Sequence, residues 1–175
     1  MALTAQGRIE LYAGTPRNGW EAIERSWPAL KRNGLFRVQA VRTTAYQIRA
    51  SCGIGASRAT PSGAAPLLAT AERDAAAIAA ERAPYSAPSA ALITAGVAAA
   101  RGDEAAAARE LRTALAGFEA CHMKLFAAAT QRRLGEVVGG DEGRTLVQQA
   151  NAWMTTHGIV KADRVTATLA PGFPD

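Results

Sequence analysis

The sequence predicts an all-α fold in which antiparallel helix hairpins stack into one array of about nine helices. Of its 175 residues, 42 are alanine, which has the highest helix propensity and is a poor strand former. Apolar residues make up 49% of the chain but aromatic residues only 6%, so the helices are expected to pack through small side chains. Stretches of β-branched residues alternating with polar ones, which would predict strands, are missing. The length suits a single domain, 1–175.

Glycine and proline divide the chain into its predicted helices. Gly14 and Pro16 end the first helix, because Gly suits a C-terminal cap and Pro cannot continue the turn. Pro28 is expected to kink or restart the second helix. The predicted helices are 2–13, 18–33, 35–52, 64–82, 89–101, a helix after Gly102-Asp103, 122–138, 142–157 and 161–169.

The apolar patterns predict how these helices pack. The third helix carries an apolar stripe and then fades into a loop break near residues 53–63. The fifth helix is small and apolar nearly all round, so we expect it to be the most buried. The helices within about 142–170 are expected to cap the C-terminal end of the array. The stripe of the third helix consists of Leu35, Val38, Val41, Ala45, Ile48 and Cys52.

The segment 91–115 has the layout of a tetratricopeptide repeat. Small residues, Ala95 and Gly96, occupy its first helix, and Gly102 marks the turn. Ala, Leu and Ala follow five, nine and twelve residues after that glycine, where two helices can cross closely only if small residues face each other. We therefore predict a tetratricopeptide-like right-handed superhelix.

Charge and cysteine content bear on the partners and the compartment. The net charge is +5 and the pI is about 9.8, but the arginines are spread along the chain and mostly sit beside Glu or Asp, which argues against nucleic acid as the partner. Cys52 and Cys121 lie far apart without a CxxC motif or a secretory signal, which favours a reducing cytoplasm. No charge-free apolar run reaches 18 residues, so we expect no membrane span.

The sequence offers no catalytic machinery. His122 and His157 are the only histidines, and neither has partners at the spacing of a metal site. Phosphate loops, kinase motifs and the GxSxG nucleophile pattern are missing from the sequence. We therefore predict a non-enzyme with no catalytic, cofactor-binding or metal-binding residues.

One polar stripe on the third helix is a candidate partner-binding site. Gln39, Arg42, Tyr46 and Arg49 follow helical spacing beside the buried stripe, and Arg and Tyr are favoured anchors in protein interfaces. Replacing Arg42 and Arg49 by Ala is then expected to weaken a partner without unfolding the array. The alternative is that these arginines pair within the fold, with Glu21, Glu24 or Glu72.

The C-terminal third resembles a known family. Arg132-Arg133-Leu134-Gly135, the run 139–143, Trp153-Met154, Gly158-Ile159 and Ala170-Pro171-Gly172-Phe173 resemble the C-terminal tetratricopeptide-like region of large bacterial Ser/Thr protein kinases and related multidomain signalling ATPases. The resemblance covers about 90–173, and 9–49 resembles the preceding part. Lys161-Ala162 departs from the Asn-Pro start that relatives often carry, so the entry to the last helix is expected to differ.

The resemblance implies a regulatory protein-interaction module, whose partner is a protein or peptide, including a kinase or ATPase domain of the same polypeptide. Whether the chain is a fragment or a free-standing product stays open. Two alternatives remain: a module that self-associates as a homo-oligomer or holds a catalytic domain inhibited, and an Arg-rich nucleic-acid binder.

Overall fold

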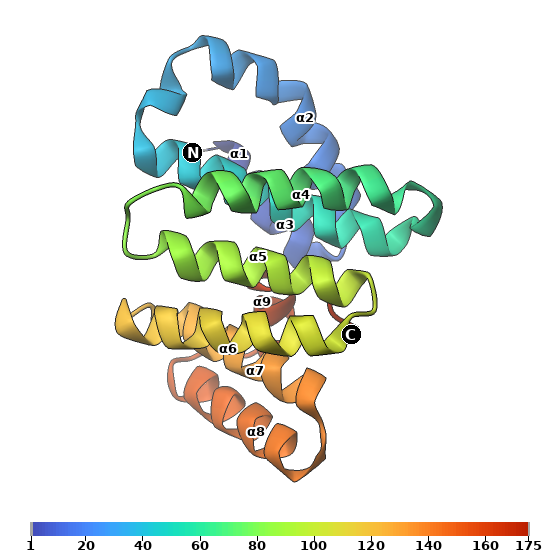
Figure 1. The fold of residues 1–175 in the computed structure, drawn as a ribbon, viewed down its shortest axis with the longest axis vertical. Coiled ribbons are helices and arrows are strands. Elements are labelled where there is room, and N and C mark those ends of the chain that lie inside the picture. The colour runs from blue at the N-terminus through green and yellow to red at the C-terminus, as the bar shows by residue number, and fades with distance from the viewer. Residues whose placement is uncertain (1, 175) are drawn as a thin grey trace.

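In a computed structural model, which describes residues 2–174, the chain is all-helical, with no strand in that range (Figure 1). The prediction of an all-α chain built from about nine α-helices is confirmed for this part. The elements are α1 (Ala2–Ala13), α2 (Pro16–Arg32), the 3₁₀ turn η1 (Leu35–Arg37), α3 (Gln39–Ala59), the 3₁₀ turn η2 (Pro61–Gly63), α4 (Ala64–Ala79), α5 (Ser86–Ala100), α6 (Glu104–Ala120), α7 (Lys124–Val138), α8 (Gly140–Thr156) and α9 (Ala162–Leu169).

Most helix boundaries follow the punctuation in the sequence. Helix α1 has the predicted bounds and ends at Gly14, whose φ of 80° suits glycine. Helix α2 begins at Pro16, earlier than predicted, because proline is well tolerated in the first helical turn. It continues through Pro28, so the helix does not restart there. From α4 to α9 the boundaries differ from the predicted ones by at most about three residues.

Helix α3 differs most from the prediction. It begins after η1 and runs on through Gly53 and Gly55 to Ala59, so the break expected at 53–63 is confined to residues 60–63. The two glycines are contact points rather than helix breakers. A Cβ at Gly53 would lie 2.8 Å from the ring of Trp20, and one at Gly55 would lie 2.7 Å from Pro16. The first part of the predicted apolar stripe is exposed: Leu35 lies in η1, Val38 between η1 and α3, and Val41 in the first turn of α3.

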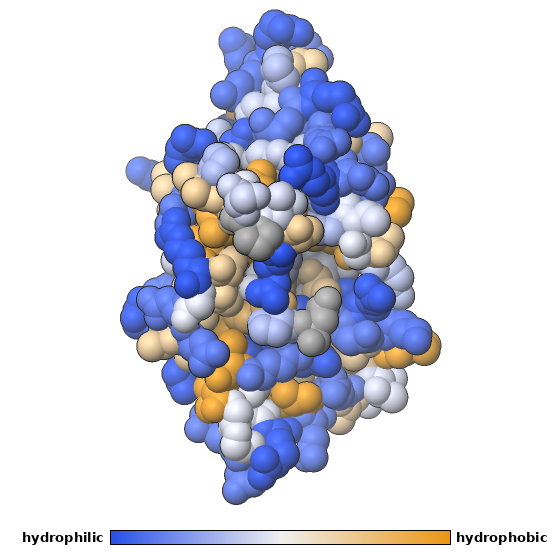
Figure 2. All heavy atoms as spheres, turned by 90° about the vertical axis from the view of Figure 1, so that its right-hand side faces the viewer, coloured by the Kyte–Doolittle hydropathy of each residue, from blue (hydrophilic) through white to orange (hydrophobic). Residues whose placement is uncertain are grey.

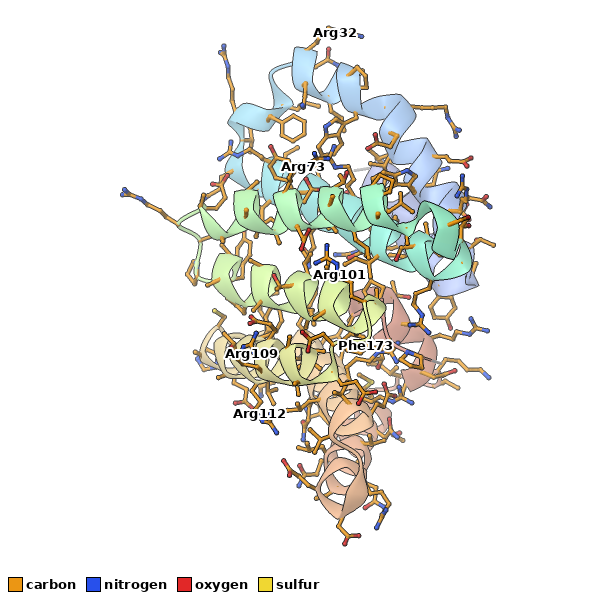
Figure 3. All side chains as sticks on the ribbon, turned by 45° about the vertical axis from the view of Figure 1, so that its right-hand side comes forward. Arg32, Arg73, Arg101, Arg109, Arg112 and Phe173 are labelled. Atoms are coloured by element: carbon orange, nitrogen blue, oxygen red, sulfur yellow. The ribbon has the colours of Figure 1, made fainter. Side chains whose placement is uncertain are left out.

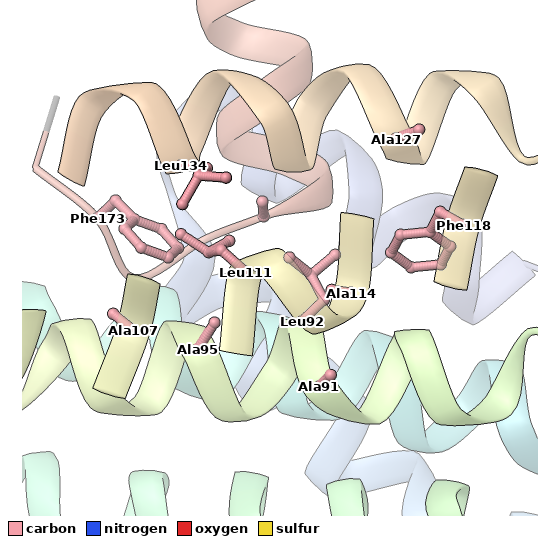
Figure 4. Packing of buried hydrophobic residues seen from close by; sticks show 11 residues of the cluster. Ala91, Leu92, Ala95, Ala107, Leu111, Ala114, Phe118, Ala127, Leu134 and Phe173 are labelled. Carbon is pink, nitrogen blue, oxygen red and sulfur yellow. The ribbon is translucent and has the colours of Figure 1, made fainter. Parts of the chain in front are cut away.

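Neighbouring helices pack in antiparallel pairs, α3 with α4, α5 with α6 and α7 with α8 (Figure 1). The successive pairs also contact one another, through α4 with α5 and α6 with α7. As predicted, α5 is deeply buried, with ten of its 15 residues buried. The apolar core runs along the array in several clusters, and the cluster around α5, α6 and α7 contains Phe118, Leu111, Leu134 and Phe173 (Figure 4).

The last helix folds back into the array. Helix α9 packs against α1 and α7, and less closely against α8, and Figure 1 shows it behind α5 and α6, away from the end formed by α8. Of the helices within 142–170, α8 lies at one end of the array and α9 lies against α1 and α7, and their capping role stays a prediction. Between residues 2 and 174, no helix is both long and apolar enough to cross a bilayer.

Candidate functional site

The predicted polar stripe on α3 is engaged with the rest of the fold. At its N-terminal end, the Gln39 side-chain amide donates to Glu81 over 3.1 Å, and the Arg42 Nε donates to the same carboxylate over 2.5 Å. Arg42 also donates to the carbonyl oxygen of Phe36. These hydrogen bonds tie α3 to the residue that closes the turn after α4. The hydrogen bond from Arg42 holds the pKa of Glu81 below its usual value.

Arg49 is at the centre of a buried ion pair. Its Nε donates to Asp74 Oδ2 over 2.8 Å and its Nη2 to Oδ1 over 2.5 Å, which is the bidentate geometry that favours Arg with a carboxylate. Asp74 on α4 is only 1% exposed. Glu24 lies 3.6 Å from Arg49 Nη1, and the guanidinium stacks on the Trp27 ring at 3.5 Å from the ring centre. Burial raises the pKa of Asp74, against the opposing effect of Arg49.

Tyr46 belongs to an aromatic cluster rather than to an open surface. Its ring centre lies 5.7 Å from that of Trp27 and 5.6 Å from that of Phe36, and these two rings are 5.3 Å apart in an edge-to-face arrangement. Such spacings are favourable for aromatic pairs. The cluster packs α2, η1 and α3 together, and Arg49 covers one side of it.

The four stripe residues therefore share one side of α3, as their spacing predicts, and that side faces α2 and α4. Glu24 is the only one of the three alternative carboxylates that approaches an arginine of the stripe, because Glu21 pairs with Arg17 and Glu72 with Arg101. Sequence reasoning missed Asp74 and Glu81 as partners. A partner-binding role of the stripe stays a prediction.

A second arrangement involves the extended C-terminal segment, residues 170–174, which lies against the inner surface of the array. The inner surface is the side of α1, α3, α5 and α7 that faces α9 and this segment. The carbonyl oxygen of Ala170 accepts from Arg133 Nε over 3.1 Å, and that of Pro174 accepts from Arg133 Nη1 over 3.2 Å. Arg58 Nη1 donates to the carbonyl oxygen of Gly172 over 3.2 Å. Main-chain groups of the segment are thus held by side chains of α3 and α7.

The side chain of Phe173 anchors the same segment. It is 3% exposed and packs in one cluster with Ala107, Leu111 and Leu134 (Figure 4). The Arg133 guanidinium lies 5.3 Å from the centre of its ring, within the range of a cation–π contact. Arg133 itself is only 2% exposed, and its charge is offset by Glu136 at 2.7 Å.

Backbone approaches backbone where the segment passes α5. A Cβ on Gly96 would lie 2.6 Å from the carbonyl oxygen of Pro171. Gly172 has a φ of 107°, and a Cβ on Gly172 would lie 2.5 Å from the carbonyl oxygen of Gly96. Only glycine fits at both positions. In the sequence, the sign of this contact is the Pro-Gly-Phe motif after the last helix. The local pattern of the motif does not specify the surface against which the segment packs.

The histidines have structural surroundings. His157 Nδ1 lies 2.8 Å from the carbonyl oxygen of Trp153, and its ring stacks on that indole with centres 4.0 Å apart. His122 adopts a φ of 57° in the turn between α6 and α7. Within residues 2–174 no three His, Cys, Asp or Glu side chains gather as a metal site would require.

The fold and these contacts define an all-helical array of paired helices whose last segment turns back onto the inner surface. Comparison of the chain with protein-family models, curated proteins and solved structures found no match.

Proposed function

We propose that this protein is a non-enzymatic scaffold for protein–protein interactions, in which the inner surface of a tetratricopeptide-like right-handed superhelix holds an extended segment of a partner. The observation that carries the proposal is the packing of residues 170–174 against the inner surface of the array. An extended stretch of polypeptide lies there, held through its carbonyl oxygens by Arg58 and Arg133 and through one buried aromatic ring. Recognition of main-chain groups together with one anchor side chain is a common way to bind peptides.

The family resemblance in the C-terminal third extends the proposal. It favours a regulatory or sensor module in bacterial signalling, whose partner belongs to a kinase or signalling ATPase, acting in the cytoplasm. The alternative of an autoinhibitory or self-associating module draws on the same observation, because a segment of the chain itself occupies the inner surface. An exchange of this segment between two copies would give a homo-oligomer.

Nucleic-acid binding has less support from the charge distribution. The labelled arginines in Figure 3 project from α2, α4, the end of α5 and α6, along the length of the array. Arg101 pairs with Glu72 at 2.6 Å and Arg109 with Glu110 at 3.3 Å. Arg112 also lies 3.9 Å from Glu142, so carboxylates offset three of these five arginines, and the row lacks the continuous basic charge that nucleic-acid binders carry.

A peptide competition experiment tests the scaffold proposal. A fluorescent peptide with the sequence of residues 167–175 is titrated into the natural chain and into Phe173→Ala. Burying a phenylalanine side chain contributes about 1.5–3 kcal/mol, so the peptide should bind the variant at least about tenfold more tightly, because its ring fills the emptied pocket. The natural chain binds weakly, since its own segment competes at a high effective concentration.

The matched control is the same peptide with Ala in place of Phe. Equal binding of the two peptides to Phe173→Ala, or no binding of either at millimolar concentration, would overturn the proposal. Phe173→Leu, which shrinks the anchor side chain but keeps an apolar group in the core, serves as the second host if Phe173→Ala does not fold. Light scattering of the natural chain then addresses the alternative, because a strict monomer argues against self-association.

A further inference from the structure

A cavity of about 300 Å³ lies beside the C-terminal segment, where α1 and α3 both end. Three arginines border it, and none of its twelve lining residues is acidic. They come from separate elements: Arg58 from the last turn of α3, Arg133 from α7 and Arg164 from the first turn of α9. Figure 2 shows the side of the molecule where α3 ends, and hydrophilic residues predominate on it.

Two of these guanidinium groups have no carboxylate partner among the residues that the structure describes. Within residues 2–174, no carboxylate lies within ion-pair distance of Arg58 or Arg164. The single side-chain hydrogen bond of Arg58 in that range goes to the Gly172 carbonyl oxygen, and none is formed by the side chain of Arg164. Arg133 differs, because Glu136 offsets its charge. The described lining of the cavity therefore carries an excess of about two positive charges.

The positions of these arginines are only partly explained by the helices that carry them. A cation in the last turn of a helix is stabilised by the helix dipole, which accounts for Arg58. The same dipole disfavours a cation in the first turn, where Arg164 lies. Its guanidinium instead reaches Gly14, with Nη1 3.3 Å from where a Cβ of that glycine would be. The positive charge of Arg164 therefore lies at the cavity and does not stabilise the helix that carries it.

We propose that this cavity is a binding site for a phosphate monoester or free phosphate, with Arg58 and Arg164 as the charge-pairing residues and Arg133 as the buried wall. A phosphoryl group carries about −1.5 to −2 charges at neutral pH and three strong acceptor oxygens, which matches two uncompensated guanidinium groups with free donors. A volume of about 300 Å³ is at the lower end of small-ligand pockets and leaves room for the group that bears the phosphate. The cavity shares Arg58 and Arg133 with the contacts that hold the C-terminal segment, but phosphate binding is measured with that segment in place and does not depend on the proposed peptide-binding role.

A second cavity lies beside the first one and is less suited to an anion. It has a volume of about 190 Å³ and is lined by three arginines, Arg132, Arg133 and Arg164, and by the carboxylates of Glu136 and Asp163. The two carboxylates offset two of the three positive charges and repel an anion, so the phosphoryl group is assigned to the first cavity, whose lining has no acidic residue.

The test is a titration of the full chain with inorganic phosphate at about pH 7.5, followed by NMR of the arginine Nε–H groups and by thermal unfolding, against chloride at equal ionic strength. Arg58→Gln/Arg164→Gln should weaken phosphate binding about tenfold or more, since it removes two charge-assisted contacts. The matched control is Arg25→Gln/Arg82→Gln, which changes the net charge equally at two arginines without a side-chain hydrogen bond or ion pair among the described residues. It should change binding less than about twofold.

Three further arms complete the experiment. Phosphoserine in place of phosphate tells whether the group is carried on a larger molecule or is the free ion, and tighter binding of either supports the site. Acetate should bind more weakly, because it carries a single charge. The single variant Arg164→Gln tests the site if the double variant does not fold, since the Arg164 side chain makes no hydrogen bond to the described residues. No binding of phosphate by the natural chain, equal binding of acetate, or equal losses in both double variants would each overturn the assignment.

Discussion

Replacing Arg49 by Ala is expected to destabilise the protein strongly, because it leaves Asp74 buried without a partner. The side chains of Arg49 and Asp74 are 13% and 2% exposed, and breaking such a buried pair costs about 3–5 kcal/mol. Loss of the stacking on Trp27 adds a contribution of about 0.5–2 kcal/mol. A total near 5 kcal/mol is a large fraction of the stability of a typical domain.

The assay is urea unfolding followed by circular dichroism at neutral pH. With a denaturant slope of about 2 kcal/mol/M, the loss lowers the midpoint by about 2.5 M. Arg25→Ala, at an exposed position of α2, serves as the control and should change stability by less than about 0.5 kcal/mol. Arg49→Met/Asp74→Leu should recover most of the loss, because an apolar pair leaves no buried charge.

The pH dependence gives a second readout of the same prediction. Burial already raises the pKa of Asp74 in the natural chain, and without Arg49 it rises further. The folded variant then holds a proton that the unfolded chain has released, so its deficit shrinks as pH falls toward the usual range of Asp. A midpoint for Arg49→Ala equal to that of the Arg25 control would refute this account and favour a role of Arg49 in partner binding.

Three further predictions follow from other contacts. Gly96→Ala should lower the free energy of unfolding by about 1–3 kcal/mol and release the C-terminal segment to proteolysis, because the added Cβ would meet its backbone. With a thiol reagent at about pH 8, half-buried Cys121 should react in the native state while Cys52 reacts only on unfolding, since burial raises the pKa of Cys52 to about 12. Because the pKa of Glu81 is lowered by Arg42, its stabilising effect is present above its usual pKa and lost as pH falls below that value. An acid titration of stability should show this loss in the natural chain and not in Glu81→Gln.

Local signals predicted the helices well, but they did not predict which residues would meet. Helical spacing alone places Arg42 and Arg49 on one side of α3. Their partners Glu81 and Asp74 lie 39 and 25 residues further along the chain, and their approach depends on how α4 is positioned against α3. In the sequence, Asp74 follows Glu72 and Arg73, a polar run typical of an exposed helix side. In the structure its carboxylate is buried, and it is stable there because Arg49 approaches from another helix.

Helix α9 links the two ends of the chain, which an open stack of hairpins does not do. In such a stack each unit contacts its neighbours alone, so the ends unfold independently. Here α9 contacts both α7 and α1, and the segment after it bonds to α3 through Arg58. The two ends of the chain therefore stabilise each other. Removing residues from Gly158 onward should therefore loosen α1 as well as α7 and α8. Hydrogen exchange of the α1 amides measures this effect. In an open solenoid the truncation would leave the exchange rates of α1 unchanged.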